Sequence, residues 1–206
     1  MAHNKSDILE KCVNLFLQYG IKSLTMDYIA QALHISKKTL YQHFKDKSDL
    51  VCQAMKAKCE VDRNEIEEIV NTSSNAIDEL LSINNYFSEL LQSMHPSIHF
   101  DLDKYYNDAW RVFNEHRNVH LKCITVNNLE KGIESGLYRK DLNTEIIAQF
   151  YIARIDLIFN ATVFPTRVYK FNDVQKEMLN YHIRGIASEK GIRYFETMSG
   201  RGRDES

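Results

Sequence analysis

The spacing of apolar residues, with few helix-breaking residues between them, is the feature that most constrains this chain. Apolar residues recur three and four positions apart along most of the sequence rather than at alternate positions. This is the period of an amphipathic α-helix and not of a strand. The 206 residues include only two prolines and seven glycines, so long helices can continue without interruption. The sequence therefore predicts an all-α protein.

Capping residues and polar breaks divide this pattern into about nine predicted helices. Thr25, Ser36 and Asn143 are typical N-cap residues, Asp46 precedes another apolar run, and Gly20 is typical of a helix C-terminus. The predicted helices cover residues 6–19, 26–34, 37–44, 46–70, 76–94, 103–135 with a break near 107, 144–163 and 172–188. Loops are predicted at 95–100 and 136–142.

Charge is distributed unevenly between the start of the chain and the rest. Residues 1–60 contain nine lysines and six acidic residues, whereas the remaining residues contain 17 basic and 22 acidic ones. Lys37, Lys38, Lys45 and Lys47 lie close together, with only Asp46 opposing them. A basic segment suits a polyanion such as nucleic acid, while the acidic remainder is expected to stay away from it.

A very short turn joins the predicted helices 26–34 and 37–44. Such a connection holds two helices at a steep angle, as in a helix-turn-helix motif. Ala30 is a small residue for the helix crossing, Ile35 is an apolar residue in the turn, and His34 occupies the position that must tolerate a positive φ. The outer face of the second helix then carries basic and hydrogen-bonding side chains, namely Lys37, Lys38, Thr39, Tyr41, Gln42 and His43.

About the first 60 residues closely resemble the TetR family of bacterial transcriptional regulators. The resemblance rests on Leu24, Thr25, Ile29, Ala30, Leu33, Ile35, Ser36, Thr39, Leu40, Tyr41, His43, Phe44, Lys47 and Leu50. The rest of the chain matches the family in layout only, through Gly136, Leu137, Tyr138 and Arg139 before a long apolar helix and through Gly185, Ile186, Ala187 and Gly191 near the end. His34 and Lys38 depart from the family pattern, in which many members have glycine.

The resemblance implies a ligand-responsive regulator, most often a repressor, that binds a palindromic double-stranded DNA operator as a homodimer in the cytoplasm. Residues 1–48 would form a three-helix DNA-binding domain, 49–70 a connecting helix, 71–198 a ligand-binding and dimerisation domain, and 199–206 a disordered tail. The resemblance implies that Thr25, Thr39, Tyr41 and Lys47 hold phosphates, while Lys37, Lys38, Gln42 and His43 face the major groove. These side chains suit those tasks, because lysine can donate to guanine and glutamine can bind adenine through two hydrogen bonds.

The predicted helix 144–163 is apolar on nearly every side, so it must be buried on two sides. It can form the centre of a single core, or it can pack on one side within the subunit and on the other against a partner. TetR relatives dimerise through their last two long helices. The resemblance therefore places the dimer interface at Ile155, Phe159, Met178 and His182.

Aromatic side chains gather in the middle of the chain, together with charged residues inside the apolar helix. Such residues can line a pocket for a small, partly apolar molecule, since these pockets combine apolar walls with a few polar anchors. The candidate effector contacts are Tyr86, Phe87, Trp110, Phe113, Tyr151 and Arg154. The alternative for the aromatic residues is the core, and for Arg154 it is an internal salt bridge to an Asp or Glu.

The sequence offers little support for other classes of protein. It contains no catalytic motif, no phosphate-binding glycine loop and no membrane-spanning apolar stretch. The four cysteines contain no metal-type pair and are expected to be buried apolar groups. A metal site at His95, His99, His116 and His120 is the less favoured alternative to solvated side chains, and no cofactor is expected. The remaining rivals are a helical ligand-binding or adaptor protein without DNA binding, and a helical enzyme.

Overall fold

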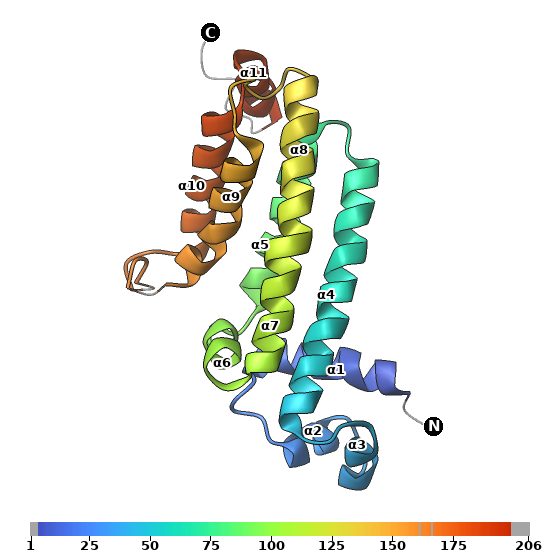
Figure 1. Cartoon of the computed structure of the whole chain (residues 1–206). Helices are drawn as coiled ribbons and strands as arrows, with labels where there is room; N and C mark the ends of the chain where they lie inside the picture. The colour runs from blue at the N-terminus through green and yellow to red at the C-terminus, as the bar shows by residue number, and fades with distance from the viewer. Residues whose placement is uncertain (1–3, 161, 166, 199–206) are drawn as a thin grey trace. The chain divides into compact units, whose positions relative to one another are not determined.

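A computed structural model describes residues 4–160, 162–165 and 167–198 of the chain (Figure 1). Within these residues the regular elements are helices, which confirms the predicted all-α fold class. They are α1 (Lys5–Tyr19), α2 (Met26–Ala32), α3 (Lys37–His43), α4 (Lys47–Thr72), α5 (Ala76–Ser93), α6 (Ile98–Tyr105), α7 (Asn107–Glu115), the π-helix η1 (His116–Leu121), α8 (Lys122–Glu134), α9 (Thr144–Phe159), α10 (Phe171–Ile186) and α11 (Glu189–Met198). None of the helices in the described residues is long and apolar enough to cross a membrane.

The chain packs as two compact units. The N-terminal unit consists of Met1–Glu65 and Leu90–Arg117, and the C-terminal unit consists of Ile66–Glu89 and Asn118–Ser206. This division differs from the predicted one, which assigned residues 71–198 to the second domain. The physical reason is that Ile98, Leu102 and Ala109 are buried in the same apolar core as the first helices. The predicted tail 199–206 lies outside the described residues.

The N-terminal unit is built around one side of α1. Ile8, Cys12 and Phe16 recur at a spacing of four and are buried, as the sequence predicted, while Tyr19 is 42% exposed. Burial raises the pKa of the Cys12 thiol to about 12. This thiol therefore stays protonated and packs as an apolar group, as predicted. Cys59 is also buried, whereas Cys52 is of intermediate burial and Cys123 is exposed, so the prediction of buried cysteines is wrong for Cys123.

The C-terminal unit brings α8, α9 and α10 side by side (Figure 1). The predicted loop 136–142 is present, and an antiparallel bridge joins its Tyr138 to Ala187. The Tyr138 ring is 1% exposed and lies over Gly132, where an added Cβ would come within 2.0 Å of the ring. Gly191 is similarly close-packed, because a Cβ there would lie 2.0 Å from the Leu137 carbonyl oxygen.

Two helix boundaries differ by more than two residues from the sequence predictions, and one helix is not predicted at all. The segment 95–100 was predicted as a loop, but α6 begins at Ile98. The predicted helix 144–163 ends instead at Phe159, because Asn160 adopts an extended backbone and caps a following turn. The sequence also missed α11, whose start is fixed by the Ser188 hydroxyl accepting from the Gly191 amide at 3.1 Å. The break predicted near residue 107 is confirmed, since α7 begins there.

Candidate nucleic-acid interface

Two side-chain caps and one left-handed residue shape the predicted helix-turn-helix. The Thr25 hydroxyl accepts from the Tyr28 amide at 3.1 Å, and the Ser36 hydroxyl accepts from the Thr39 amide at 2.9 Å. Between the two helices, His34 has a φ of 54°. This confirms that the turn needs a positive φ at a non-glycine residue, which costs about 1 kcal/mol. The N-caps begin α2 and α3 where the sequence predicted.

The recognition face, defined here as the exposed side chains of α3, is separated from the core by the helical period. Leu40 and Phe44 are 0% and 1% exposed and hold the inner side of this segment. Lys38, Tyr41 and Gln42 are exposed. The structure therefore presents a cation, a phenol and a carboxamide together on one short helix. These are groups that bind phosphates and base edges.

Lys37 differs from the other predicted contacts because an acidic side chain already holds it. Its ammonium lies 2.7 Å from the Asp27 carboxylate, and both side chains are exposed. The hydrogen bond and the charge of Asp27 raise the pKa of Lys37. The same ammonium lies 6.0 Å from the centre of the Tyr41 ring. Lys37 is thus charged and accessible, but it must exchange Asp27 for phosphate or base when it binds DNA.

Lys47 is more enclosed than the resemblance suggested. Its ammonium donates to the Lys22 carbonyl oxygen at 3.3 Å and lies 5.7 Å from the centre of the Tyr106 ring. Burial lowers the pKa of Lys47, and the charge of Asp101 partly opposes that effect. The side chain therefore ties the start of α4 to the loop between α1 and α2. His43 is half-buried, and its ring lies 6.1 Å from that of Phe44.

The acidic residues that follow α3 are occupied by backbone amides. Asp46 accepts from the Asp49 amide at 2.9 Å, and Asp49 accepts from the Lys45 amide at 2.9 Å and from the Gln53 side chain at 2.7 Å. These hydrogen bonds lower the pKa of Asp49. The negative charges of Asp46 and Asp49 complement the positive end of the α4 dipole. The lysines around them remain the accessible charges of this surface.

Asp101 is a residue that sequence reasoning missed. Its carboxylate is 4% exposed and accepts from the amides of Ile21 and Lys22 at 3.1 and 2.9 Å, and from the Ser97 hydroxyl at 3.1 Å. It thus fixes the loop that leads into α2. Ser97 and Asp101 stand four residues apart, a spacing that would have pointed to one helix face if the segment had not been predicted as a loop.

The six predicted effector contacts are divided between the two units. Trp110 and Phe113 belong to the N-terminal unit, where their rings stack at 5.4 Å and His99 meets Trp110 edge-on. Tyr86, Phe87, Tyr151 and Arg154 belong to the C-terminal unit. Tyr86 meets Phe87 at 5.3 Å, and Arg154 lies 3.7 Å from the centre of the Tyr151 ring. The assignment of these six residues to one effector site stays a prediction.

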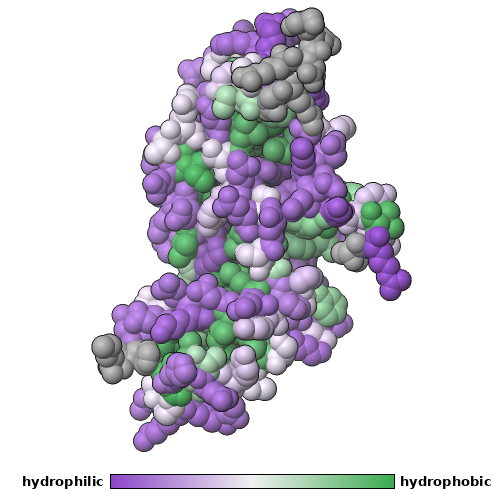
Figure 2. Space-filling model, turned by 180° about the vertical axis from the view of Figure 1, so that it is seen from behind, coloured by the Kyte–Doolittle hydropathy of each residue, from purple (hydrophilic) through white to green (hydrophobic). Residues whose placement is uncertain are grey.

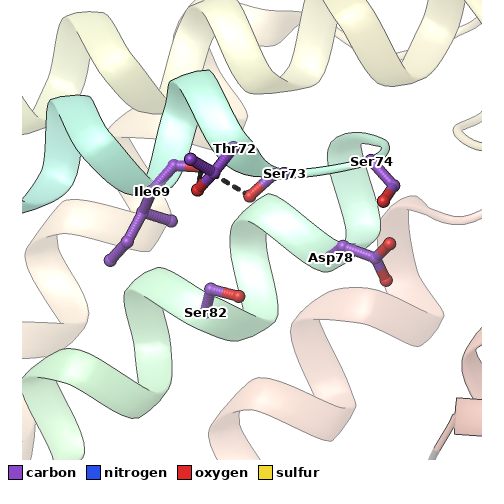
Figure 3. Close-up of a pocket in the computed structure, with 6 residues that line it drawn as sticks. All are labelled: Ile69, Thr72, Ser73, Ser74, Asp78 and Ser82. Carbon is purple, nitrogen blue, oxygen red and sulfur yellow. Dashed lines mark hydrogen bonds between the residues drawn. The ribbon is translucent and has the colours of Figure 1, made fainter.

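A surface pocket of about 250 Å³ lies elsewhere in the C-terminal unit, where α4 ends and α5 begins (Figure 3). Its lining consists of Ile69, Thr72, Ser73, Ser74, Asp78 and Ser82. The Ser73 hydroxyl donates back to the Ile69 carbonyl at 2.6 Å, so part of this polar lining is already satisfied. None of the predicted effector contacts contributes to it.

The four predicted dimer residues are partly buried. Ile155, Phe159, Met178 and His182 are all of intermediate burial, and the His182 ring lies 4.5 Å from that of Tyr151 within the same unit. A separate stripe on α9 is exposed instead, formed by Ile146, Phe150 and Leu157, of which Phe150 is 68% exposed. Tyr181 on α10 is 85% exposed.

Apolar side chains also gather at the surface where α9 connects to α10, on the right of Figure 2. Val163, Val168 and Tyr169 of this connection are all exposed, Val168 by 71%. Together with the α9 stripe they leave unpartnered apolar surface on the C-terminal unit. Surfaces of this kind mark interaction sites in soluble proteins.

The predicted histidines form no metal site in the described part of the chain, where no group of three or more His, Cys, Asp or Glu side chains could hold a metal ion. His95 instead lies 3.0 Å from the Ser97 hydroxyl, and its backbone amide donates to the Leu17 carbonyl at 2.6 Å. It therefore takes part in the same loop anchor as Asp101.

Comparison with known proteins identifies the region that contains this surface. Residues 8–54 match the family described as "Bacterial regulatory proteins, tetR family". The chain is 24% identical over 202 residues to the transcriptional repressor KstR2 of Mycolicibacterium smegmatis, covering 94% of this chain and 95% of the repressor.

Solved structures extend the similarity to nearly the whole chain. A TetR-family regulator from Agrobacterium tumefaciens superposes with a TM-score of 0.70 at 19% identity, over 89% of this chain and 98% of the other. The regulator FadR of Bacillus subtilis, solved in complex with stearoyl-CoA, gives a TM-score of 0.66 at 22% identity, over 87% of this chain and 97% of the other. Both show that the fold is shared.

Proposed function

We propose that this chain is a regulator of the TetR type, since residues 8–54 match that family, and that it represses transcription by binding a palindromic operator as a homodimer and releases it when an effector binds. Chromosomal DNA as the target would place the protein in the cytoplasm. The recognition face on α3 carries this proposal. It combines exposed Lys38, Tyr41 and Gln42 with the Ser36 cap that holds the start of the helix.

The roles within this face follow from the chemistry of each group. Gln42 can read an adenine through two hydrogen bonds, and Lys38 can donate to the two acceptors of a guanine. Tyr41 would donate to a phosphate, which fixes the position of the helix without reading sequence. Lys37 would add a further contact after leaving Asp27. Lys47 would act through the loop that it holds, with a phosphate contact at most secondary.

Selection of DNA sequences by the purified protein tests this proposal. We expect enrichment of a palindrome, with affinity that falls as salt rises. Gln42→Ala should relax the preference at particular bases, whereas Tyr41→Phe should weaken binding to all sequences. Lys38→Gln removes a charge from the recognition face. Lys56→Gln is its charge-matched control, because Lys56 is exposed on α4 away from α3. A protein that enriches no sequence would be a helical ligand-binding or adaptor protein instead.

The exposed stripe on α9 supports the homodimer. An aromatic residue that is 68% exposed on a largely apolar helix fits an interface better than the four predicted residues, which are all of intermediate burial. Phe150→Glu should therefore yield monomers in sedimentation. Phe159→Glu should lower stability, since that ring lies 5.9 Å from the Phe171 ring. A Phe150→Glu protein that remains dimeric would move the interface elsewhere.

The proposed release of DNA makes a quantitative demand on the effector. A 100-fold loss of operator affinity needs about 2.7 kcal/mol of coupling between the two sites. Because coupling is reciprocal, operator DNA must weaken effector binding by the same factor. Calorimetry measures the effector affinity of the protein with operator DNA and without it. Equal effector affinities in the two titrations would exclude effector-driven release.

A further inference from the structure

The guanidinium of Arg154 lies over an aromatic ring in the C-terminal unit, and only part of its hydrogen-bonding capacity is used. Its guanidinium carbon lies 3.7 Å from the centre of the Tyr151 ring, and its Nη2 donates to the Asn84 side-chain oxygen at 3.3 Å. His182 lies beside the same ring, 4.5 Å from it. We call Asn84, Tyr151, Arg154 and His182 the Arg154 cluster. Stacking on a ring fixes the plane of a guanidinium and leaves its edges free to donate.

One nitrogen of this guanidinium, Nη1, has no hydrogen-bond partner among the described residues. This nitrogen is also buried. No carboxylate among the described residues pairs with Arg154, so the salt bridge considered as an alternative from the sequence is absent from that part of the chain. Its one polar partner, Asn84, is neutral and only 6% exposed. A buried N–H without an acceptor and a buried cation without an anion both cost free energy.

His182 adds a neutral donor to the cluster rather than a second charge. Burial and the nearby charge of Arg154 lower the pKa of His182 to about 3. At neutral pH the ring therefore carries a single N–H proton and no charge. The cluster thus offers one positive charge in the unit whose apolar core includes the buried side chains of Ile152, Leu179 and Ile183.

We infer that the Arg154 cluster is the anchor for a monoanionic carboxylate with an apolar remainder. This inference rests on the proposed function, because it names the chemical class of the effector. A planar carboxylate matches the planar edge of a guanidinium, and one negative charge balances the one cation present. A phosphate monoester would bring about two negative charges and leave an excess buried charge. The buried apolar neighbours suit an aliphatic or aromatic remainder.

Binding of a panel of simple probes tests the charge requirement. Octanoate, decanoate and dodecanoate are titrated into the full-length protein by calorimetry and thermal denaturation, with octanol, octylamine and octyl phosphate as matched probes. We expect the carboxylates to bind and to raise the Tm, while the alcohol and the amine do not. Equal stabilisation by octanol, a preference for octyl phosphate, or no response to any carboxylate would overturn the inference.

Three variants test the residue. Arg154→Gln should weaken octanoate binding roughly 10- to 100-fold, as expected for the loss of a charge-assisted hydrogen bond. Arg184→Gln is the matched control, because Arg184 is exposed and pairs with Glu196 on the surface at 3.0 Å. Asn84→Asp keeps the side-chain volume and supplies an internal carboxylate to Arg154. It should fold, retain or raise the Tm, and lose octanoate binding.

The outcomes separate this inference from the proposed function. Octanoate binding that depends on Arg154 in a protein that selects no DNA sequence would support the anchor and reject the regulator. Sequence-specific DNA binding in a protein whose octanoate affinity is unchanged by Asn84→Asp would support the regulator and reject the anchor. A crystal structure grown with octanoate that shows only a water on Nη1 would also overturn the anchor.

Discussion

The helix-turn-helix segment and the C-terminal unit use polar side chains in opposite ways. Across described residues 4–54, the buried side chains are apolar and the polar groups lie on the surface or cap helices. The C-terminal unit buries a different set, namely Glu79, Asn84, Thr125, Asn128 and Gln175. Duplex DNA cannot enter a protein, so its contacts must lie outside. A small effector is enclosed, so the groups that recognise it lie inside.

The largest effect is expected in the apolar core of the first region. Phe44→Ala should lower the free energy of unfolding by about 3–5 kcal/mol, because a large ring that is 1% exposed leaves a cavity behind. Denaturant titration measures this change.

Tyr41→Ala should abolish operator binding at nearly unchanged stability, since Tyr41 is 45% exposed.

The comparison depends on that separation between inside and outside. A loss of stability in Tyr41→Ala as large as in Phe44→Ala would show that the recognition face also holds the fold. Retained DNA binding in folded Tyr41→Ala would remove this residue from the face. Hydrogen exchange of residues 4–54 distinguishes local loosening from loss of a contact.

The second prediction concerns the close packing of the C-terminal unit. Gly132→Ala should destabilise it by about 1–3 kcal/mol, because the added methyl group would overlap the buried Tyr138 ring. Gly136→Ala should cost only about 1 kcal/mol, since it meets no atom within 4 Å and pays for its positive φ alone. Equal costs would mean that backbone conformation, rather than the Tyr138 contact, dominates here. Thermal denaturation compares the two variants.

The helix-turn-helix could be predicted from sequence because its causes are local. Thr25 and Ser36 cap helices through bonds to residues three positions away, and Leu40 and Phe44 are buried because of their helical spacing. A short-range pattern is visible in one sequence. The same reasoning predicts the exposure of Lys37, Lys38, Tyr41 and Gln42 without any information on tertiary contacts, whereas Thr39 and His43, also predicted to face outward, are of intermediate burial.

The C-terminal site could not be predicted to the same degree because its contacts join distant positions. Asn84 and Arg154 are separated by 70 residues. No local pattern reports such pairs. Arg154 was identified as an anomalous charge on an apolar helix, but its partner Asn84 was not found. The family resemblance places His182 at a dimer interface, and its position in the sequence gives no sign of the Tyr151 contact.

The third prediction is a pH dependence that originates in the Arg154 cluster. The pKa of His182 is about 3 in the folded protein and near 6.5 when the chain is unfolded. The unfolded chain therefore binds the extra proton below pH 6.5, and stability must fall as the pH falls, by up to about 1.4 kcal/mol per pH unit. His182→Gln should flatten this slope in denaturant titrations at several pH values. An unchanged slope would show that His182 is not enclosed as described.

The smallest effect compares one helix cap from each region. Ser36 caps α3 by accepting from the Thr39 amide at 2.9 Å, and Asn143 caps α9 by accepting from the Ile146 amide at 3.1 Å. Replacing either with Ala should cost about 1 kcal/mol of stability, because each change leaves one helix-end amide unpaired. Their functional effects should differ. Ser36→Ala loosens the start of the recognition helix and should weaken operator binding, whereas Asn143→Ala should leave operator affinity unchanged. Thermal denaturation and DNA titration of both variants measure these changes. Equal losses of DNA affinity in the Ser36→Ala and Asn143→Ala variants would mean that the two regions are coupled through stability alone. The division between an outer and an inner recognition surface would then no longer explain how this chain works.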